Sequence, residues 1–419
     1  MGRGLVLVPL SPLRGDGKMN VTLKLRSENW LLLGGYDTKF HKDDPFRTQS
    51  IKGLWRYWLR AYIAGALYEA GKLKCKKECV AEIKYICEKT GDILGSLNSA
   101  SKFRIIVNKV SFDEKECKNI NGAQRIRLLS LGRREKVSHG ENLYVEIRIE
   151  ESPHVKKVDE NEEKLALGSL LTALSLNGVG KGGRRGLGTF SIEVDGFEGG
   201  FLKGKKIDYN MLRELINETL DSARSYLNLG VEKVSEIPLL DCVSRLKIDL
   251  SEIDESISLF NKKEAPVFIV IKVEPKTKKR MEDTVIELQD FFYRPGRSGR
   301  MGFKITSADK SQDSITRKRL AWFLGLPREQ RETGYTSDVN RRASPIHLAV
   351  HEENALFTFF LSGDWPTEIK WRGLHEEGQQ SKKPLDVDGG RVKEAYLCSI
   401  SSLENYLKKM NYNYEVVYP

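Results

Sequence analysis

Gly178-Val-Gly-Lys-Gly-Gly-Arg-Arg-Gly-Leu-Gly-Thr-Phe190 is the stretch that says most about how this chain folds. After Gly178 it contains five glycines, three basic residues and no carboxylate. Residues 163–176, before it, carry the apolar spacing of a helix, and residues 189–194, after it, alternate as a strand does. The stretch is therefore expected to be a basic, glycine-rich loop that joins a helix to a strand.

The residue types in this loop suit a polynucleotide backbone. Glycine tolerates positive φ and lets backbone N–H groups approach a ligand, while cations neutralise phosphodiesters. The loop lacks the Gly-Lys-Ser/Thr ending of a Walker loop, and a dinucleotide fingerprint would instead open a helix after a strand. We predict a phosphate-binding loop, with a glycine-rich surface turn that only keeps the protein soluble as the alternative. The predicted RNA-binding residues are Gly180, Lys181, Gly182, Gly183, Arg184, Arg185 and Gly186.

A second basic feature lies on the helix expected over residues 50–68. Its apolar residues form a broad face that must be buried, and Trp55 and Trp58 belong to that face. Lys52, Arg56 and Arg60 recur every four residues, so they form one cationic stripe along the helix. We predict that this stripe binds RNA, with an ordinary solvated helix face as the alternative.

The first half of the chain has the pattern of one α+β domain. Strands are expected at 20–26, 102–110, 142–149 and 189–194, and helices at 50–68 and 163–176. This order, strand-helix-strand-strand-helix-strand, is the split βαβ pattern of a ferredoxin-like domain, which by itself specifies no function. An additional amphipathic helix over 207–227 is expected to pack between the two halves, with the boundary near 230–235.

The second half contains further strands, helices and another basic segment. Strands are expected at 244–250, at 267–273, from Ile346, from Leu356 and at 412–417, helices at 315–324 and 401–410, and a loop at 327–342. Residues 294–304 contain no carboxylate, and their guanidinium groups suit phosphates in an exposed loop. The predicted RNA-binding residues are Arg294, Arg297, Arg300 and Lys304, with a disordered linker as the alternative.

Length and charge limit the classes of function. A chain of 419 residues with 40% hydrophobic residues suggests two or three domains with real cores. The formal net charge of +11 favours an acidic partner, with nucleic acid ahead of an anionic membrane. No apolar run approaches the roughly 20 residues that span a bilayer, so we expect a cytoplasmic protein with no membrane partner. Residues 1–18 are expected to be a leader that contributes little to the fold.

The six cysteines are scattered along the chain and form no paired Cys-x-x-Cys units. Reduced thiols are the default interpretation, and we expect no metal and no cofactor. A metal site built from Cys75 and Cys79, completed by Cys87 and Cys117, is the alternative.

Four motifs resemble the RAMP superfamily of CRISPR ribonucleoproteins. They are Leu33-Gly-Gly-Tyr-Asp37 with Arg47-Thr-Gln-Ser-Ile-Lys-Gly-Leu-Trp-Arg-Tyr-Trp-Leu-Arg-Ala61, then Leu94-Gly-Ser-Leu-Asn-Ser-Ala-Ser-Lys-Phe-Arg104, the glycine-rich loop, and Arg341-Arg-Ala-Ser-Pro-Ile-His-Leu348. The first and fourth are most similar to the family of the first subunit of the type III-B Cmr complex. The glycine-rich loop is shared broadly across the superfamily.

The resemblance implies two tandem ferredoxin-like (RRM-like, βαββαβ) domains with insertions, at residues 19–235 and 236–419. It also implies a non-catalytic subunit of a guide-RNA effector complex, whose partners are single-stranded target RNA, CRISPR guide RNA and other RAMP-type subunits. The proposed basic residues would line a cleft between the domains and hold the phosphate backbone. The second half departs from the family because no glycine-rich loop precedes its final strand.

Three alternatives remain open at this point. Some RAMP-type proteins are metal-independent endoribonucleases that process CRISPR RNA, and His41 and His139 are the candidate general bases, whereas His347 lies in an apolar strand and is expected to be structural. A metal-dependent nuclease would need clustered carboxylates, and Asp37, Asp43 and Asp44 lack a convincing distant partner. An architectural subunit would use its basic face only against acidic proteins. The aromatic residues that could stack on unpaired bases are Trp30, Tyr36, Phe40 and Tyr293, with packing in the core or at an interface as the alternative for each.

Overall fold

The computed structural model describes residues 19–31, 46–74, 80–116, 138–153, 155, 158–195, 206–253, 257–260, 264–275, 281–293, 314–330, 333–338, 341–351, 353–374 and 380–419. The predicted leader, residues 1–18, lies outside these ranges. Among the helices so described, none is long and apolar enough to cross a membrane.

The first half is built on an antiparallel sheet. Its strands are β1 (Asn20–Ser27), β2 (Phe103–Glu116), β3 (Ser138–Glu151), β4 (Phe190–Asp195) and β5 (Lys206–Ile207), in the order β2-β3-β1-β4-β5. Val21, Leu23 and Leu25 of β1 are buried, and the residues between them are more exposed. Because neighbouring side chains of a strand point to opposite faces, this alternation leaves one face of the sheet apolar and covered.

Helices cover that apolar face. They are α1 (Thr48–Glu69) and α4 (Glu160–Leu176), while α5 (Met211–Tyr226) packs on both of these helices and α2 (Val80–Leu94) packs against α1. A capping box starts α4: Asp159 accepts from the N–H of Glu162, whose side chain in turn accepts from the N–H of Asp159. From Leu165 to Leu176 every residue of α4 is buried, because the helix also contacts the second half of the chain.

The second half contains a second antiparallel sheet with its own helices. Its strands are β8 (Phe268–Glu274), β11 (Ile346–His351), β12 (Asn354–Phe360) and β15 (Asn413–Tyr418), in the order β11-β12-β8-β15. The helical segments are α6 (Met281–Tyr293), α7 (Ser314–Arg317), the 3₁₀ turn η1 (Ala321–Leu324) and α8 (Gly389–Lys409). Smaller sheets are formed by β9 (Arg328–Gln330), β10 (Thr333–Thr336), β13 (Glu368–Leu374) and β14 (Gln380–Asp386), and by β6 (Lys247–Asp249) with β7 (Glu264–Pro266).

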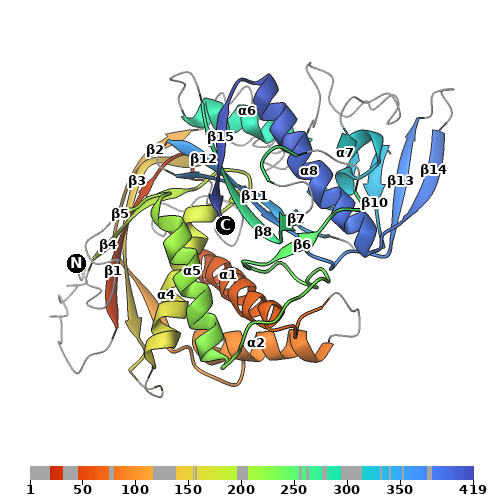
Figure 1. Cartoon of the computed structure of the whole chain (residues 1–419). Helices are drawn as coiled ribbons and strands as arrows, with labels where there is room; N and C mark the ends of the chain where they lie inside the picture. The colour runs from red at the N-terminus through yellow and green to blue at the C-terminus, as the bar shows by residue number, and fades with distance from the viewer. Residues whose placement is uncertain are drawn as a thin grey trace.

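The two main sheets are layered with helices between them and beyond. In Figure 1, α1, α4 and α5 lie between the β1–β5 sheet and the strands of the second half. On β12, Phe360 faces α1, with its ring 5.5 Å from that of Trp58, whereas Phe357 faces α6, with its ring 5.8 Å from that of Phe292. Because helices cover both faces, every residue of β11 is buried, and its sequence is a nearly continuous apolar run.

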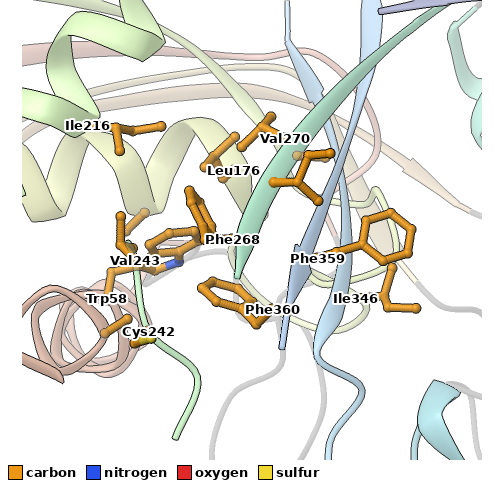
Figure 2. Close-up of a cluster of buried hydrophobic side chains, with 14 of the residues drawn as sticks. Trp58, Leu176, Ile216, Cys242, Val243, Phe268, Val270, Ile346, Phe359 and Phe360 are labelled. Atoms are coloured by element: carbon orange, nitrogen blue, oxygen red, sulfur yellow. The ribbon is translucent and has the colours of Figure 1, made fainter. Parts of the chain in front are cut away.

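One hydrophobic core extends through both halves. Trp58 of α1 lies between them, with its ring 6.3 Å from that of Phe268. Figure 2 shows Trp58, Phe268 and Phe360 grouped next to Cys242 and Val243. These two residues belong to the linking segment, residues 227–246, which joins the two halves between α5 and β6. Trp55 and Trp58 are fully buried, which confirms their predicted place in the core.

The linking segment runs along α1 in close backbone contact. The N–H of Val243 donates to the carbonyl of Ala61 at 3.0 Å, and buried Glu69 accepts from the N–H of Arg245 at 2.6 Å. A Cβ added to Gly65 would lie 1.7 Å from the carbonyl oxygen of Val243. Gly65 is therefore the position where α1 needs glycine so that the linking segment can approach.

The predicted helix over 207–227 corresponds to α5, and it does contact both halves. It packs on α4 and α1, and Arg213 Nε donates to the carbonyl of Val417 in β15 at 3.1 Å. The hydroxyl of Tyr418 donates to Asn217 of α5 at 3.3 Å. The prediction that this helix packs between the halves is confirmed.

Predictions in the second half were less accurate. The expected helix over 315–324 is two short segments, α7 and η1, separated where Arg319 adopts a φ of 55°. The expected loop over 327–342 contains β9 and β10, and α8 begins at Gly389 rather than near residue 401. α6 of the second half and α2 of the first half were not predicted. β10 forms by pairing with β13, so the decisive contacts are distant in sequence and leave no local periodicity.

We expect Gly65→Ala to destabilise the protein by at least about 1–3 kcal/mol, because the new methyl group meets backbone rather than a movable side chain. Gly53→Ala, on the same helix, is the matched control: nothing lies within 4 Å of the added Cβ, so stability should rise by about 0.5–1 kcal/mol. Urea denaturation of both variants measures this difference. Equal stability of Gly65→Ala and wild type would contradict the close contact.

Candidate nucleic-acid interface

The glycine-rich loop between α4 and β4 is a compact turn closed by its own backbone. Gly180, Gly182, Gly186 and Gly188 have φ values of 88°, 81°, 81° and 67°. The N–H of Gly178 donates to the carbonyl of Gly183 at 2.8 Å, and that of Val179 donates to Gly188 at 2.8 Å. These conformations favour glycine, so the glycine content of the loop follows from its backbone.

The same loop docks onto the edge strand of the second sheet. The N–H of Gly186 donates to the carbonyl of Leu348 at 2.8 Å, and the N–H of Leu348 donates to the carbonyl of Arg184 at 3.0 Å. A Cβ on Gly186 would lie 3.0 Å from side-chain atoms of both Leu348 and Val285. The loop is therefore a joint between the two halves, as well as a connection between α4 and β4.

Part of the loop backbone is engaged by the protein itself. The N–H groups of Gly178, Val179, Arg185, Gly186 and Gly188 all donate to carbonyls of the protein itself. Those amides are already used, and the phosphate-binding role of the rest of the loop stays a prediction.

The loop cations have different surroundings. The guanidinium of Arg184 lies over the ring of Tyr57, with Cζ 5.0 Å from the ring centre, and Arg184 is half-buried. Within the described part of the chain, its guanidinium has no ion-pair partner. The guanidinium of Arg185 instead lies 4.1 Å from the ring centre of Phe292 and donates to the carbonyl of Leu324 at 3.4 Å. Arg185 thus points into the joint, and Lys181 is half-buried.

The cationic stripe of α1 is also divided. Lys52 and Arg60 are exposed, and neither has an ion pair to any residue that the structure describes. Arg56 Nη2 donates to the carbonyls of Leu94 and Gly95, at 2.5 and 2.7 Å, at the end of α2. Those carbonyls have no partner inside the helix, so Arg56 caps α2 and is less available to a ligand than its two neighbours.

A network at the joint brings in residues that were not predicted as site residues. The hydroxyl of Tyr57 donates to Asp241 Oδ2 at 3.0 Å, and Arg342 Nη2 lies 3.3 Å from Asp241 Oδ1. Arg342 also donates to the hydroxyl of Ser362 at 2.8 Å and to the carbonyl of Asp364 at 2.8 Å. The motif 341–348 was recognised in the sequence, but nothing local indicated that Arg342 meets Tyr57 and Asp241.

Charges in this network shift the titration of its members. Burial alone would raise the pKa of Asp241, but the Arg342 guanidinium and the Ser362 hydroxyl outweigh it and hold that pKa below its usual range. Burial, with the nearby Asp241 charge, raises the pKa of Tyr57 well above its usual range. At neutral pH, Asp241 is therefore ionised and Tyr57 is a protonated donor.

His347 of β11 is fully buried in the same region. Its ring lies 5.7 Å from that of Tyr57, 6.3 Å from that of Trp58 and 5.5 Å from that of Phe360. Burial and the charges of Arg184, Arg185 and Arg342 lower its pKa well below the usual range, with only Asp241 opposing them. This position is consistent with the structural role predicted for His347.

The outer face of the first sheet is different in character, because several of its charges are paired. Lys24 lies 3.1 Å from Glu193 and 3.5 Å from Asp195, and Arg148 lies 3.4 Å from Glu150. The half-buried Trp30 follows β1. A face with matched charges attracts a phosphate backbone less than the joint does.

Several predicted residues lie outside the described part of the chain. They are Tyr36, Phe40, His41, Arg294, Arg297, Arg300 and Lys304. His139 lies on β3 and Tyr293 ends α6, but their side chains are outside the description. Among the described residues no group of three or more His, Cys, Asp or Glu side chains could hold a metal ion.

The buried His347 makes stability depend on pH. Its unfolded pKa is near 6.5 and its folded pKa is lower, so the unfolded chain binds the proton more tightly. Above about pH 6.5, neutral His347 makes its full contribution to the free energy of unfolding. That contribution is lost as the pH falls from about 6.5 toward the folded pKa. We expect His347→Gln to reduce the slope of the free energy of unfolding between pH 6.5 and 5, measured by urea titration at each pH. An unchanged slope would contradict this assignment.

Comparisons with known proteins agree with the sequence motifs. The family model described as "RAMP superfamily" matches residues 26–191. The crystal structure of apo Cmr1 from Pyrococcus furiosus matches 96% of this chain and 99% of its own, with a TM-score of 0.52 and 15% identity. A chain of the Type III-B Cmr-beta structure bound to cognate target RNA matches 93% of this chain and 100% of its own, with a TM-score of 0.52 and 14% identity.

A search of curated protein sequences finds no match. The structural likenesses show the fold, which extends beyond the segment matched by the family model. Residues 26–191 thus match the RAMP superfamily model, within a chain whose fold is similar to that of Cmr1 over nearly its whole length.

Proposed function

We propose that this chain is a non-catalytic RNA-binding subunit of a type III-B CRISPR effector complex, and that it holds RNA by its phosphate backbone at the joint between its two halves. Its partners are single-stranded target RNA, guide RNA and other RAMP-type subunits. The observation that carries the proposal is the state of Arg184: a half-buried guanidinium held over an aromatic ring, without a carboxylate partner in the described chain.

The fold supports two tandem ferredoxin-like units around this joint. In each main sheet the first four strands in chain order are arranged as second, third, first and fourth, and all neighbours are antiparallel. Helices follow the first and third of these strands in both halves. This is the split βαβ arrangement, in which we place the RNA at the contact between the units.

The distribution of cations supports backbone binding. Lys52, Arg60, Arg184 and Arg341 are exposed or half-buried, and the structure pairs none of them with a described carboxylate. Contacts of this kind carry no sequence information, which suits a subunit that serves many guides, because base pairing between guide and target reads the sequence. The segment containing Arg294, Arg297, Arg300 and Lys304 would add further phosphate contacts.

The endoribonuclease alternative stays a prediction, because the side chains of its candidate bases, His41 and His139, lie outside the described part of the chain. A general base must reach the 2′-hydroxyl from which it takes a proton. Of the histidines whose side chains are described, His347 and His351 are both fully buried. The nearest histidine to Arg184 that the structure describes is thus shielded from RNA by Tyr57 and Trp58.

We expect Arg184→Ala to weaken binding of labelled single-stranded RNA and to make its salt dependence shallower. Each phosphate contact with single-stranded nucleic acid contributes about 0.7 to the slope of log K against log salt, so one lost contact should remove about that much. Lys52→Ala and Arg294→Ala/Arg297→Ala should act in the same direction. Fluorescence anisotropy over a salt series measures both affinity and slope.

Arg26→Ala is the matched control, because Arg26 is an exposed cation on β1 of the first sheet, away from the joint. An equal loss from Arg26→Ala and Arg184→Ala would place the RNA on the sheet or indicate a diffuse charge effect, and would refute binding at the joint. The same RNA should remain intact with and without Mg²⁺. Cleavage by the wild type that His41→Ala or His139→Ala abolishes would establish the endoribonuclease instead.

A further inference from the structure

Four side chains from four segments form a continuous chain of contacts across the joint. Arg184 of the glycine-rich loop lies on the ring of Tyr57, 5.0 Å from its centre. The Tyr57 hydroxyl donates to Asp241 at 3.0 Å, and Asp241 is 3.3 Å from Arg342. The segments are α4–β4, α1, the linking segment and the 341–348 motif, so the contacts run from one half to the other.

We propose that Tyr57 and Asp241 are positioning residues that hold the Arg184 guanidinium ready for a phosphate of the RNA. This inference rests on the proposed function, since it assumes that Arg184 contacts RNA. It goes further because neither positioning residue needs to touch the ligand, and because one of them belongs to the segment leading into the second half.

Arg184 needs such a support because its side chain is long and flexible. A free arginine side chain carries about 2 kcal/mol of rotamer entropy, part of which is lost when it binds. A ring beneath the guanidinium restricts that freedom in advance and attracts the cation electrostatically. The ring can do this only if it is itself fixed, and the Tyr57 hydroxyl is the group that fixes it to Asp241.

Asp241 is a rigid anchor for that hydroxyl. The Asp241 and Arg342 side chains are 12% and 15% exposed, so the pair is largely shielded from water. Arg342 is itself held in place, since it also donates to Ser362 and to the carbonyl of Asp364. Its guanidinium lies 4.9 Å from the ring centre of Trp365 as well. Contacts made by the second half of the protein thus fix the position of the Arg184 guanidinium.

The arrangement also leaves positive charge for a ligand. Asp241 is the carboxylate of the network, and its ion pair is with Arg342, whereas the Arg184 guanidinium lies over the ring of Tyr57. Asp241 therefore supports Arg184 through the tyrosine and does not neutralise it by direct contact. An acceptor with phosphate oxygens is the ligand class that such a guanidinium binds best.

The test is a double-mutant cycle between Tyr57→Phe and Arg184→Ala, read by RNA anisotropy at fixed salt. Tyr57→Phe keeps the ring and removes only the hydroxyl that donates to Asp241. We expect it to weaken RNA binding by about three- to tenfold, which corresponds to the usual net contribution of one hydrogen bond. The bond that is lost is the one that orients the Tyr57 ring beneath Arg184. In the Arg184→Ala background the same change should have no further effect, because a positioning residue acts only through Arg184.

Tyr62→Phe is the matched control. Tyr62 lies on the same helix, and its buried hydroxyl is bonded to Thr172 at 2.7 Å, away from the network. It should leave RNA affinity unchanged, and circular dichroism should show all variants folded. A second arm uses Asp241→Asn, which can still accept from Tyr57, against Asp241→Ala, which cannot. Only Asp241→Ala should reproduce the loss seen with Tyr57→Phe.

The outcomes separate this inference from the proposed function. If Arg184→Ala leaves RNA affinity unchanged, binding at the joint fails and the positioning role fails with it. If Arg184→Ala weakens binding but Tyr57→Phe does not, only the positioning role is overturned. Equal, additive losses from Tyr57→Phe in both backgrounds would also overturn it, because they would indicate a general structural effect.

Discussion

The two backbone hydrogen bonds between the glycine-rich loop and Leu348 hold the candidate site together. They join the edge of the second sheet to a loop of the first half, at 2.8 and 3.0 Å. This junction joins the loop that carries Arg184 to the 341–348 motif, and in that motif the ring of His347 lies 5.7 Å from that of Tyr57. Gly186 permits it, since a side chain there would meet Leu348 and Val285.

The different roles of the basic residues follow from this packing. Arg56 and Arg185 bind backbone carbonyls and stabilise the helix end and the joint, while Lys52, Arg60 and Arg184 remain without described ion pairs. The cations that bind carbonyls and those that do not have the same side-chain chemistry. Their spacing along the helix and the composition of the loop therefore do not distinguish them. Their roles differ because some lie next to carbonyls that need a donor and others do not.

The shared core explains why residues from both halves can build one precise site. The linking segment lies on α1 with only glycine between the backbones, and Trp58 packs against strands of the second sheet. Halves fixed in this way keep Asp241 and Arg342 within bonding distance of Tyr57. A flexible connection between the halves would not keep the four side chains of the network in contact.

The sequence by itself determined the α+β class, nearly all elements of the first half, the core position of Trp55 and Trp58, and the basic glycine-rich loop. These are local properties, because helix and strand periodicity and glycine content are read within a short window. The tertiary structure alone decided that the loop glycines serve packing, that Arg56 and Arg185 are engaged, and that Tyr57, Asp241 and Arg342 meet. Those contacts join residues up to 184 positions apart, as in the Tyr57–Asp241 bond, and pairing at that range leaves no periodic trace in the chain.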